Sequence, residues 1–122
     1  MKGDQDSLYN LKARTLLFAL EIIKLVGALP KSIVMSVIGN QVLRSGTSVG
    51  AQYREASRAK SDADFVSKLE GCLQELEETR YWFELLKSID LLSQQQYSIL
   101  DDEANQLIAI FVTIVKKVKT KP

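Results

Sequence analysis

The sequence predicts an all-α fold: a single domain, residues 1–122, built as an antiparallel up-down-up-down four-helix bundle. Apolar residues recur at alternating spacings of three and four in four stretches, which is the period of an amphipathic helix. Short connectors join the stretches, so each helix should run antiparallel to the one before it. A length of 122 residues is enough for one hydrophobic core but not for two. The helices are expected at about 7–29, 32–60, 62–89 and 94–119.

The first predicted helix begins near Ser7, whose side chain can cap it, and closes at Gly27 and Pro30. Asp4 and Asp6 place negative charge near the positive end of its dipole. Its apolar face is so broad that we expect it to meet more than one neighbour. The residues of this face are Leu8, Leu11, Thr15, Leu16, Leu17, Phe18, Leu20, Ile22, Ile23, Leu25, Val26 and Leu29.

The second predicted helix has Ser32 as its cap and is rich in β-branched residues near its start. The apolar residues there do not alternate, so the period favours a helix over a strand. Gly39, Gly46 and Gly50 each cost about 1 kcal/mol relative to alanine in a helix interior. Close approach of a neighbouring helix is the simplest feature that would offset this cost.

The third and fourth predicted helices begin with capping signals. Ser61 with Asp64 three residues later resembles a capping box, and Ser93 with Gln96 has the same spacing. The third helix carries an aromatic triplet, residues 81–83, of which only some members can face one core. We therefore expect Trp82 or Tyr81 at an edge or in an interface.

The composition excludes several classes of chemistry. Without histidine, the chain lacks the usual general base near neutral pH and the commonest zinc ligand. Cys72 is the one cysteine and lies in an apolar helical pattern, so we interpret it as a small core residue. No glycine-rich phosphate loop, metal-ligand spacing or catalytic triad is present. We expect no enzyme activity, no cofactor and no small-molecule substrate.

Charge and hydropathy set the remaining limits. The formal net charge of +1 argues against a globally electrostatic binder, although it is compatible with a local basic patch. The longest uncharged runs, residues 32–43 and 104–115, are far shorter than the roughly 20 residues of a spanning helix. The first residues lack the basic start and apolar core of a signal peptide, so we expect a cytoplasmic protein without a membrane partner.

A polar stripe crosses the second helix. Arg44, Ser48, Gln52 and Glu55 follow at spacings of four, four and three, so they share one face. The first interpretation is a hydrogen-bonded network on the flank of the bundle, with Glu55 paired to Arg44 or Arg58.

A second interpretation of the same stripe is a subunit interface. Gly46 and Gly50 would admit a partner helix, and the polar residues would set its register. A catalytic role for Glu55 is disfavoured, because it would need a substrate pocket and a shifted pKa.

Two groups of basic residues are candidates for nucleic-acid contacts. Arginine side chains suit phosphate contacts through their planar donor fork. A solvated helix face is the alternative for the first group, and a helix end that complements the dipole is the alternative for the second. The groups are Arg44, Arg54, Arg58 and Lys60, and the C-terminal Lys116, Lys117, Lys119 and Lys121.

Residues 48–92 resemble the bacterial family of four-helix bundle proteins associated with 23S ribosomal RNA intervening sequences. The motifs that carry the resemblance are Ser48, Val49 and Glu55, then Ser61, Asp64 and Phe65, then Glu75, Glu78, Tyr81, Trp82, Leu85 and Leu86. One position departs from the pattern: Gln52 stands where the family has asparagine, which lengthens the side chain by a methylene group.

The resemblance implies a helical bundle and an assembly. The family is similar to the accessory proteins of diversity-generating retroelements, which form pentameric barrels and bind a reverse transcriptase and nucleic acid. We therefore expect a non-enzymatic module that associates with itself as a ring, most simply a pentamer. The alternative is an RNA-binding accessory factor, with RNA or a reverse transcriptase as its partner.

Overall fold

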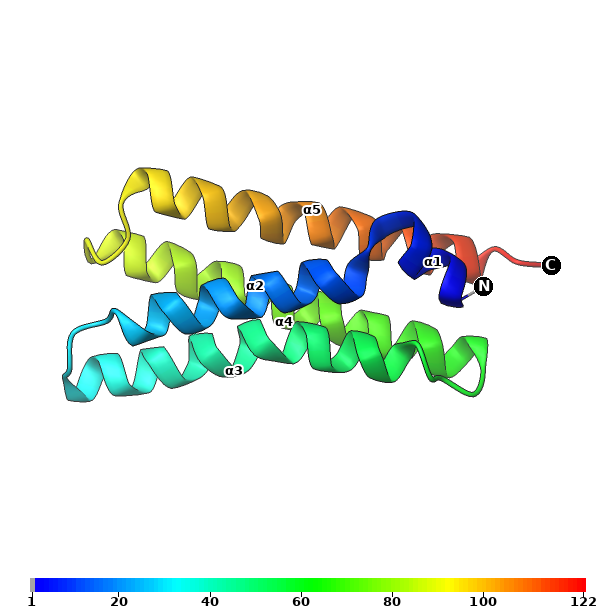
Figure 1. Cartoon of the computed structure of the whole chain (residues 1–122), viewed down its shortest axis with the longest axis horizontal. Helices are drawn as coiled ribbons and strands as arrows, with labels where there is room; N and C mark the ends of the chain where they lie inside the picture. The colour runs from blue at the N-terminus through cyan, green and yellow to red at the C-terminus, as the bar shows by residue number, and fades with distance from the viewer. Residues whose placement is uncertain (1) are drawn as a thin grey trace.

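The computed structural model describes residues 2–122, and side chains from residue 6 onward. The chain is helical between short connectors, and its helices surround one hydrophobic core (Figure 1), which confirms the predicted all-α bundle. The side chain of Asp4, expected near a helix N-terminus, lies outside the described side chains. The helices are α1 Lys2–Tyr9, α2 Leu11–Gly27, α3 Ile33–Ala56, α4 Asp62–Ser88 and α5 Gln94–Lys119.

Figure 1 shows that the chain doubles back at each connector between the four long helices. α3 packs against α2 and α4, and α4 packs against α5. The connector 57–61 lies at the same end of the bundle as both chain termini, whereas the connectors 28–32 and 89–93 lie at the other end (Figure 1). Residues far apart in sequence, such as those near 12, 56 and 116, are thereby brought to one end.

The first predicted helix is wrong in its N-terminal part, because the chain breaks at Asn10. The backbone of Asn10 has φ 55° and ψ 44°, a left-handed conformation that asparagine tolerates better than most residues. α1 is therefore a separate helix, and Ser7 lies inside it instead of capping the bundle helix. The cap of α2 comes from Asp6, whose Oδ1 accepts a hydrogen bond from the backbone N–H of Lys12 at 2.9 Å.

The other long helices begin at the predicted serine caps. Ser32 and Ser61 each accept a hydrogen bond from the backbone N–H three residues later, at 3.0 and 3.1 Å. Ser93 does the same, and the side chain of Gln96 accepts the backbone N–H of Ser93 at 3.0 Å, which completes a capping box. Such caps satisfy backbone donors that a helix end leaves free, and each contributes about 1 kcal/mol.

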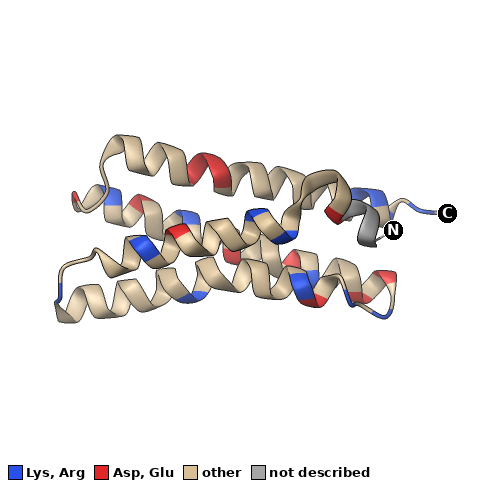
Figure 2. Cartoon of the chain, in the orientation of Figure 1, with Lys and Arg blue, Asp and Glu red and all other residues tan. Residues whose placement is uncertain are grey.

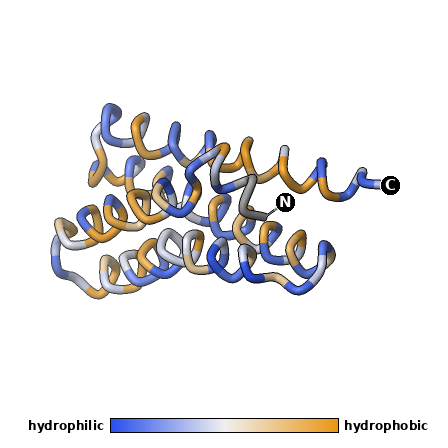
Figure 3. Tube along the Cα trace, turned by 45° about the vertical axis from the view of Figure 1, so that its right-hand side comes forward, coloured by the Kyte–Doolittle hydropathy of each residue, from blue (hydrophilic) through white to orange (hydrophobic). Residues whose placement is uncertain are grey.

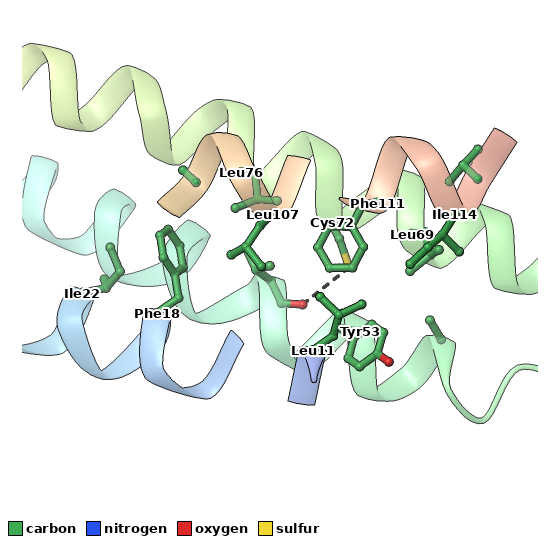
Figure 4. Packing of buried hydrophobic residues seen from close by; sticks show 14 of the residues in the cluster. Leu11, Phe18, Ile22, Tyr53, Leu69, Cys72, Leu76, Leu107, Phe111 and Ile114 are labelled. Atoms are coloured by element: carbon green, nitrogen blue, oxygen red, sulfur yellow. Dashed lines mark hydrogen bonds between the residues drawn. The ribbon is translucent and has the colours of Figure 1, made fainter. Parts of the chain in front are cut away.

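Large side chains from all four long helices fill the interior (Figure 4). The rings of Phe18 and Phe83 meet edge to face with centroids 6.3 Å apart, and those of Tyr53 and Phe111 lie 5.9 Å apart. Full burial of such a side chain stabilises the fold by about 1.5–3 kcal/mol relative to leaving it exposed. The largest fully buried side chains are Tyr53, Phe65, Phe83, Phe111, Leu11, Ile22, Leu69, Leu76, Leu86, Leu107, Ile114 and Val42.

In the described part of the chain, the hydroxyl groups of Thr15, Ser45 and Thr79 are fully buried among the apolar side chains of this core. Thr15 donates to the carbonyl oxygen of Leu11 at 2.7 Å. Thr79 Oγ1 lies 2.7 Å from the carbonyl oxygen of Glu75 and 2.8 Å from Ser45 Oγ on the neighbouring helix. Each hydroxyl therefore has a hydrogen-bond partner, which removes most of the cost of burying it.

Candidate functional site

Arg44 reaches across from α3 to α4. Its Nη1 lies 3.0 Å from Glu75 Oε2, and its Nη2 pairs with Glu78, which also accepts the indole N–H of Trp82 at 3.2 Å. The bond to Glu78 raises the pKa of Arg44. Partial burial would raise the pKa of Glu78, but the bonds from Arg44 and Trp82 outweigh it and hold that pKa below its ordinary value. Arg44 is thus committed to a link between two helices of its own chain.

Glu55 does not pair with an arginine, so that prediction is wrong. Its Oε1 lies 3.1 Å from Nζ of Lys68 on α4. Arg44 is eleven residues away, about 16 Å along the helix, and α3 ends before Arg58. The hydroxyl of Ser48 donates to the carbonyl oxygen of Arg44 at 2.6 Å. The predicted single network is therefore two separate bridges to α4, one at each end of the stripe.

Gln52 lies between the two bridges and packs over Gly71 of α4. A Cβ atom built on residue 71 would lie 1.9 Å from Gln52 Oε1. The missing side chain at Gly71 makes room for the methylene group that glutamine adds relative to asparagine. Nothing in the sequence singled out Gly71, because the contact depends on the relative register of α3 and α4.

The two glycines of the predicted interface face α2 of the same chain. A Cβ atom on Gly46 would lie 2.6 Å from Ile22 Cγ1, and one on Gly50 would lie 3.1 Å from Thr15 Oγ1. These glycines let α2 and α3 approach closely, so they are not available to a partner helix. The interpretation in which they admit another subunit is wrong for this reason.

The basic residues predicted as nucleic-acid contacts divide into two groups. Arg44 is held by α4, Lys119 pairs with Glu70 at 3.1 Å, and Lys121 pairs with Asp62 at 2.7 Å. Within the described part of the chain, five of these residues are exposed and take part in no side-chain ion pair: Arg54, Arg58, Lys60, Lys116 and Lys117.

Lys12 joins two of these free cations around a shallow pocket. The pocket lies between the first turn of α2 and the last turn of α3, and Lys12, Arg54, Glu55, Ser57 and Arg58 line it. Lys12 was not predicted as a site residue, because nothing in the pattern of residues indicates that it lies beside residues some forty positions later.

Cys72 is fully buried, as its sequence context predicts. Burial raises the pKa of its thiol to about 12, and its Sγ lies 3.5 Å from the carbonyl oxygen of Val49. In the described residues, no group of histidine, cysteine or carboxylate side chains could hold a metal ion. No helix in that part of the chain is long and apolar enough to cross a membrane.

The aromatic triplet divides as expected between core and edge. Phe83 is fully buried, whereas Tyr81 is 56% exposed and stacks edge to face on the half-buried Trp82 with ring centroids 5.1 Å apart.

Exposed aliphatic side chains gather on α2 and α3. Between 43% and 87% of the surface of each remains open to solvent. Figure 3 shows hydrophobic positions along both helices. The broad apolar face of the first predicted helix is therefore only partly used inside the chain. We call the following seven residues the apolar surface of α2 and α3: Leu16, Leu17, Leu20, Ile23, Ile33, Val34 and Val37.

A comparison with models of protein families identifies the family of this chain. The model of the 23S rRNA-intervening sequence protein family matches residues 9–113. The chain belongs to this family. The family resemblance of residues 48–92 is thereby confirmed. No curated protein matches the chain.

A solved structure supports the same assignment. This member of the 23S rRNA-intervening sequence protein family is similar to a protein of unknown function from the S23 ribosomal protein family of Bacteroides thetaiotaomicron. The two are 37% identical, the TM-score is 0.84, and the match covers 92% of this chain and 98% of the other. The family match contains Lys12, Arg54 and Arg58, whereas the C-terminal lysines lie beyond it.

Proposed function

We propose that this protein is a non-enzymatic assembly module whose copies bind one another through the apolar surface of α2 and α3. The observation that carries the proposal is the exposure of seven large aliphatic side chains on two neighbouring helices. Apolar side chains that cluster on the surface of a soluble protein commonly mark interaction sites. The one carboxylate considered for catalysis, Glu55, is exposed and paired with Lys68.

The apolar surface consists of two stripes. On α2, Leu16, Leu20 and Ile23 follow at spacings of four and three and therefore share a face. Phe18 and Ile22 of the same helix are buried in the core. With 100° of rotation per residue, the stripe points away from the core and outward from α2.

The stripe on α3 points in another direction. Val34 precedes Ser45 by eleven residues, which is close to three full helical turns, so both lie on one side of α3. Ser45 contacts Thr79 of α4, which identifies that side as the one toward α4. Val37 lies one turn after Val34 and extends the stripe.

Two unlike stripes favour a head-to-tail contact, in which the α2 stripe of one copy covers the α3 stripe of the next. Such heterologous contacts generate closed rings when the rotation between copies closes. Five copies is the number that the family resemblance implies, and we adopt it for the ring.

A second copy suits this surface better than a strongly charged partner. The net charge of the chain is +1 and its charged residues are nearly balanced in sign, so copies repel one another little. α3 carries a single charged residue, Arg44, between Ile33 and Tyr53. Arg44 is itself neutralised by α4, which leaves the flank of α3 suited to an apolar contact.

The test is the mass of the protein in solution. Light scattering coupled to gel filtration should give a multiple of 13.7 kDa at micromolar concentration, and about 69 kDa for five copies. The variant Leu16→Glu/Leu20→Glu should shift the mass toward the monomer while far-ultraviolet circular dichroism stays unchanged, since both side chains are about half exposed.

The matched control is Ala109→Glu on the exposed side of α5, which adds charge away from α2 and α3 and should leave the assembly intact. A monomeric parent protein at 100 micromolar would overturn the proposal. Equal dissociation by the control would also count against the α2 stripe, because charge alone would then explain the effect.

A further inference from the structure

We propose that the pocket between the start of α2 and the end of α3 binds the phosphate backbone of a single-stranded nucleic acid. Lys12, Arg54 and Arg58 supply the contacts. Three cations, from α2, from α3 and from the turn after α3, line one concave site, and none of them forms an ion pair within the described residues. This function is separate from self-assembly and does not depend on the apolar surface.

The rigid elements hold the cations at one place. Lys12 sits in the first turn of α2, and its backbone N–H is fixed by Asp6 at 2.9 Å. Arg54 lies in the last turn of α3, and Arg58 lies in the turn after it, two residues beyond Ala56. Two arginines and one lysine therefore line a shared hollow, and their guanidinium and ammonium groups can donate to the several oxygens of a phosphate.

The acids near the pocket are already engaged. Glu55 lines the pocket, but its carboxylate bonds to Lys68 on α4 at 3.1 Å. The carboxylate of Asp6 accepts the backbone N–H of Lys12 and the hydroxyl of Tyr53, at 2.9 and 3.2 Å. The arginines are therefore left to an external anion.

Charge is unevenly distributed along the bundle, which the net charge of +1 conceals. Residues 54–60 hold three cations and one acid, Asp62 and Asp64 follow at the start of α4, and residues 116–121 hold four lysines and no acid. Residues 77–103 hold seven acids and two cations. The topology places the two basic segments at one end (Figure 2), where α3 and α5 finish, while the acidic segment lies toward the other end.

An extended strand fits this arrangement better than an isolated phosphate ion. Lys12, Arg54 and Arg58 are exposed, so a single phosphate bound there would remain largely hydrated. A strand that continues from the pocket toward Lys116 and Lys117 gains further phosphate contacts at the same end. Each contact releases counterions, and the affinity is then steeply salt-dependent.

The experiment is a titration of fluorescently labelled single-stranded RNA, followed by anisotropy at about 50 and about 200 mM salt. The parent protein should bind with strong salt dependence. Arg54→Ala/Arg58→Ala should weaken binding about tenfold or more at the lower salt and flatten the slope of log K against log salt by about 1.4, because each phosphate contact contributes about 0.7 for a single strand. Lys12→Ala should act in the same direction with half that change in slope.

The matched control is Lys24→Ala/Lys31→Ala, which removes two cations from the opposite end of the bundle. Its binding should stay within about twofold of the parent. Absence of salt-dependent binding, or an equal loss in the control, would overturn the proposal. If inorganic phosphate displaced the RNA at an equal concentration of phosphate groups, the ligand of the pocket would be a free anion, and the proposal of a nucleic-acid strand would be wrong.

The assembly is monitored in parallel. Light scattering of Arg54→Ala/Arg58→Ala should give the parent mass, so that lost RNA binding is assigned to the pocket. A changed mass in this variant would overturn the separation of the two functions. The Leu16→Glu/Leu20→Glu variant should still bind RNA. Adding Arg54→Ala and Arg58→Ala to it should flatten the slope of log K against log salt as much as in the parent protein.

Discussion

Alanine substitutions at two glycines of α3 should change stability in opposite directions. Gly39 and Gly46 are seven residues apart and both are buried, so they occupy similar places on one helix. Either alanine gains about 1 kcal/mol of helix propensity over glycine. The difference between the two sites must therefore come from what the added methyl group meets.

At Gly39 the new Cβ atom would lie 3.5 Å from Val26 and 3.6 Å from Leu29, which is ordinary contact. At Gly46 it would lie 2.6 and 2.9 Å from two branches of Ile22, a stiff and fully buried side chain. Overpacking of this kind costs about 1–3 kcal/mol, and a backbone shift adds to it. We expect Gly39→Ala to stabilise by about 0.5–1 kcal/mol and Gly46→Ala to destabilise by about 1–2 kcal/mol.

The assay is urea unfolding followed by circular dichroism at one protein concentration, because assembly would make stability depend on concentration. The double variant Ile22→Ala/Gly46→Ala removes the clashing atoms and should be less destabilised than the sum of its parts, by about 2 kcal/mol. Equal effects of alanine at Gly39 and Gly46, or strictly additive effects in the double variant, would refute the close approach of α2 and α3.

We make three further predictions about the stability of variants at buried and half-buried residues. Since the pKa of Cys72 is raised from 9.0 to about 12, its contribution to stability is complete below pH 9 and is lost as the pH rises; unfolding measured from pH 8 to 10 should show a loss of about 1.4 kcal/mol that Cys72→Ala lacks. Gly71→Ala should stabilise by about 1 kcal/mol in a Gln52→Ala background but not in the parent, and the same gain in both would contradict the contact between these residues. Asp101 lies 2.9 Å from the half-buried Arg80, whereas Glu21 pairs with the exposed Lys24. Asp101→Asn should therefore lower the free energy of unfolding in urea by about 1 kcal/mol more than Glu21→Gln does. Equal losses in the two variants would contradict a stabilising role for the Arg80–Asp101 pair.

The helices and their caps could be predicted because those signals are local. The period of apolar residues and the hydrogen bonds of Ser32, Ser61 and Ser93 each involve residues a few positions apart. The break at Asn10 was not predicted, because Leu8 and Leu11 continue the apolar spacing across it. One left-handed residue changes the direction of the chain without changing the hydrophobic pattern.

The partners of the polar stripe could not be predicted, because they depend on how α3 and α4 are aligned. Arg44 meets Glu75 and Glu78, and Glu55 meets Lys68, only in the observed register. Lys12 likewise enters the basic pocket through the packing of α2 on α3. Sequence spacing identifies the residues on one face of a helix, whereas side-chain pairing between helices needs the tertiary structure.

The break at Asn10 also has a consequence for motion. The hydroxyl of Tyr53 donates to Asp6 of α1 at 3.2 Å, and its pKa is raised by burial and by the nearby Asp6 carboxylate. The buried residues of the core begin at Leu11, after the break, so we expect α1 to open without disrupting the core that the four long helices share. Such an opening is a local unfolding event with its own free energy, separate from global unfolding. Ionisation of Tyr53 is coupled to that opening, which makes the phenol an internal reporter of how often the chain uncovers this end of its core.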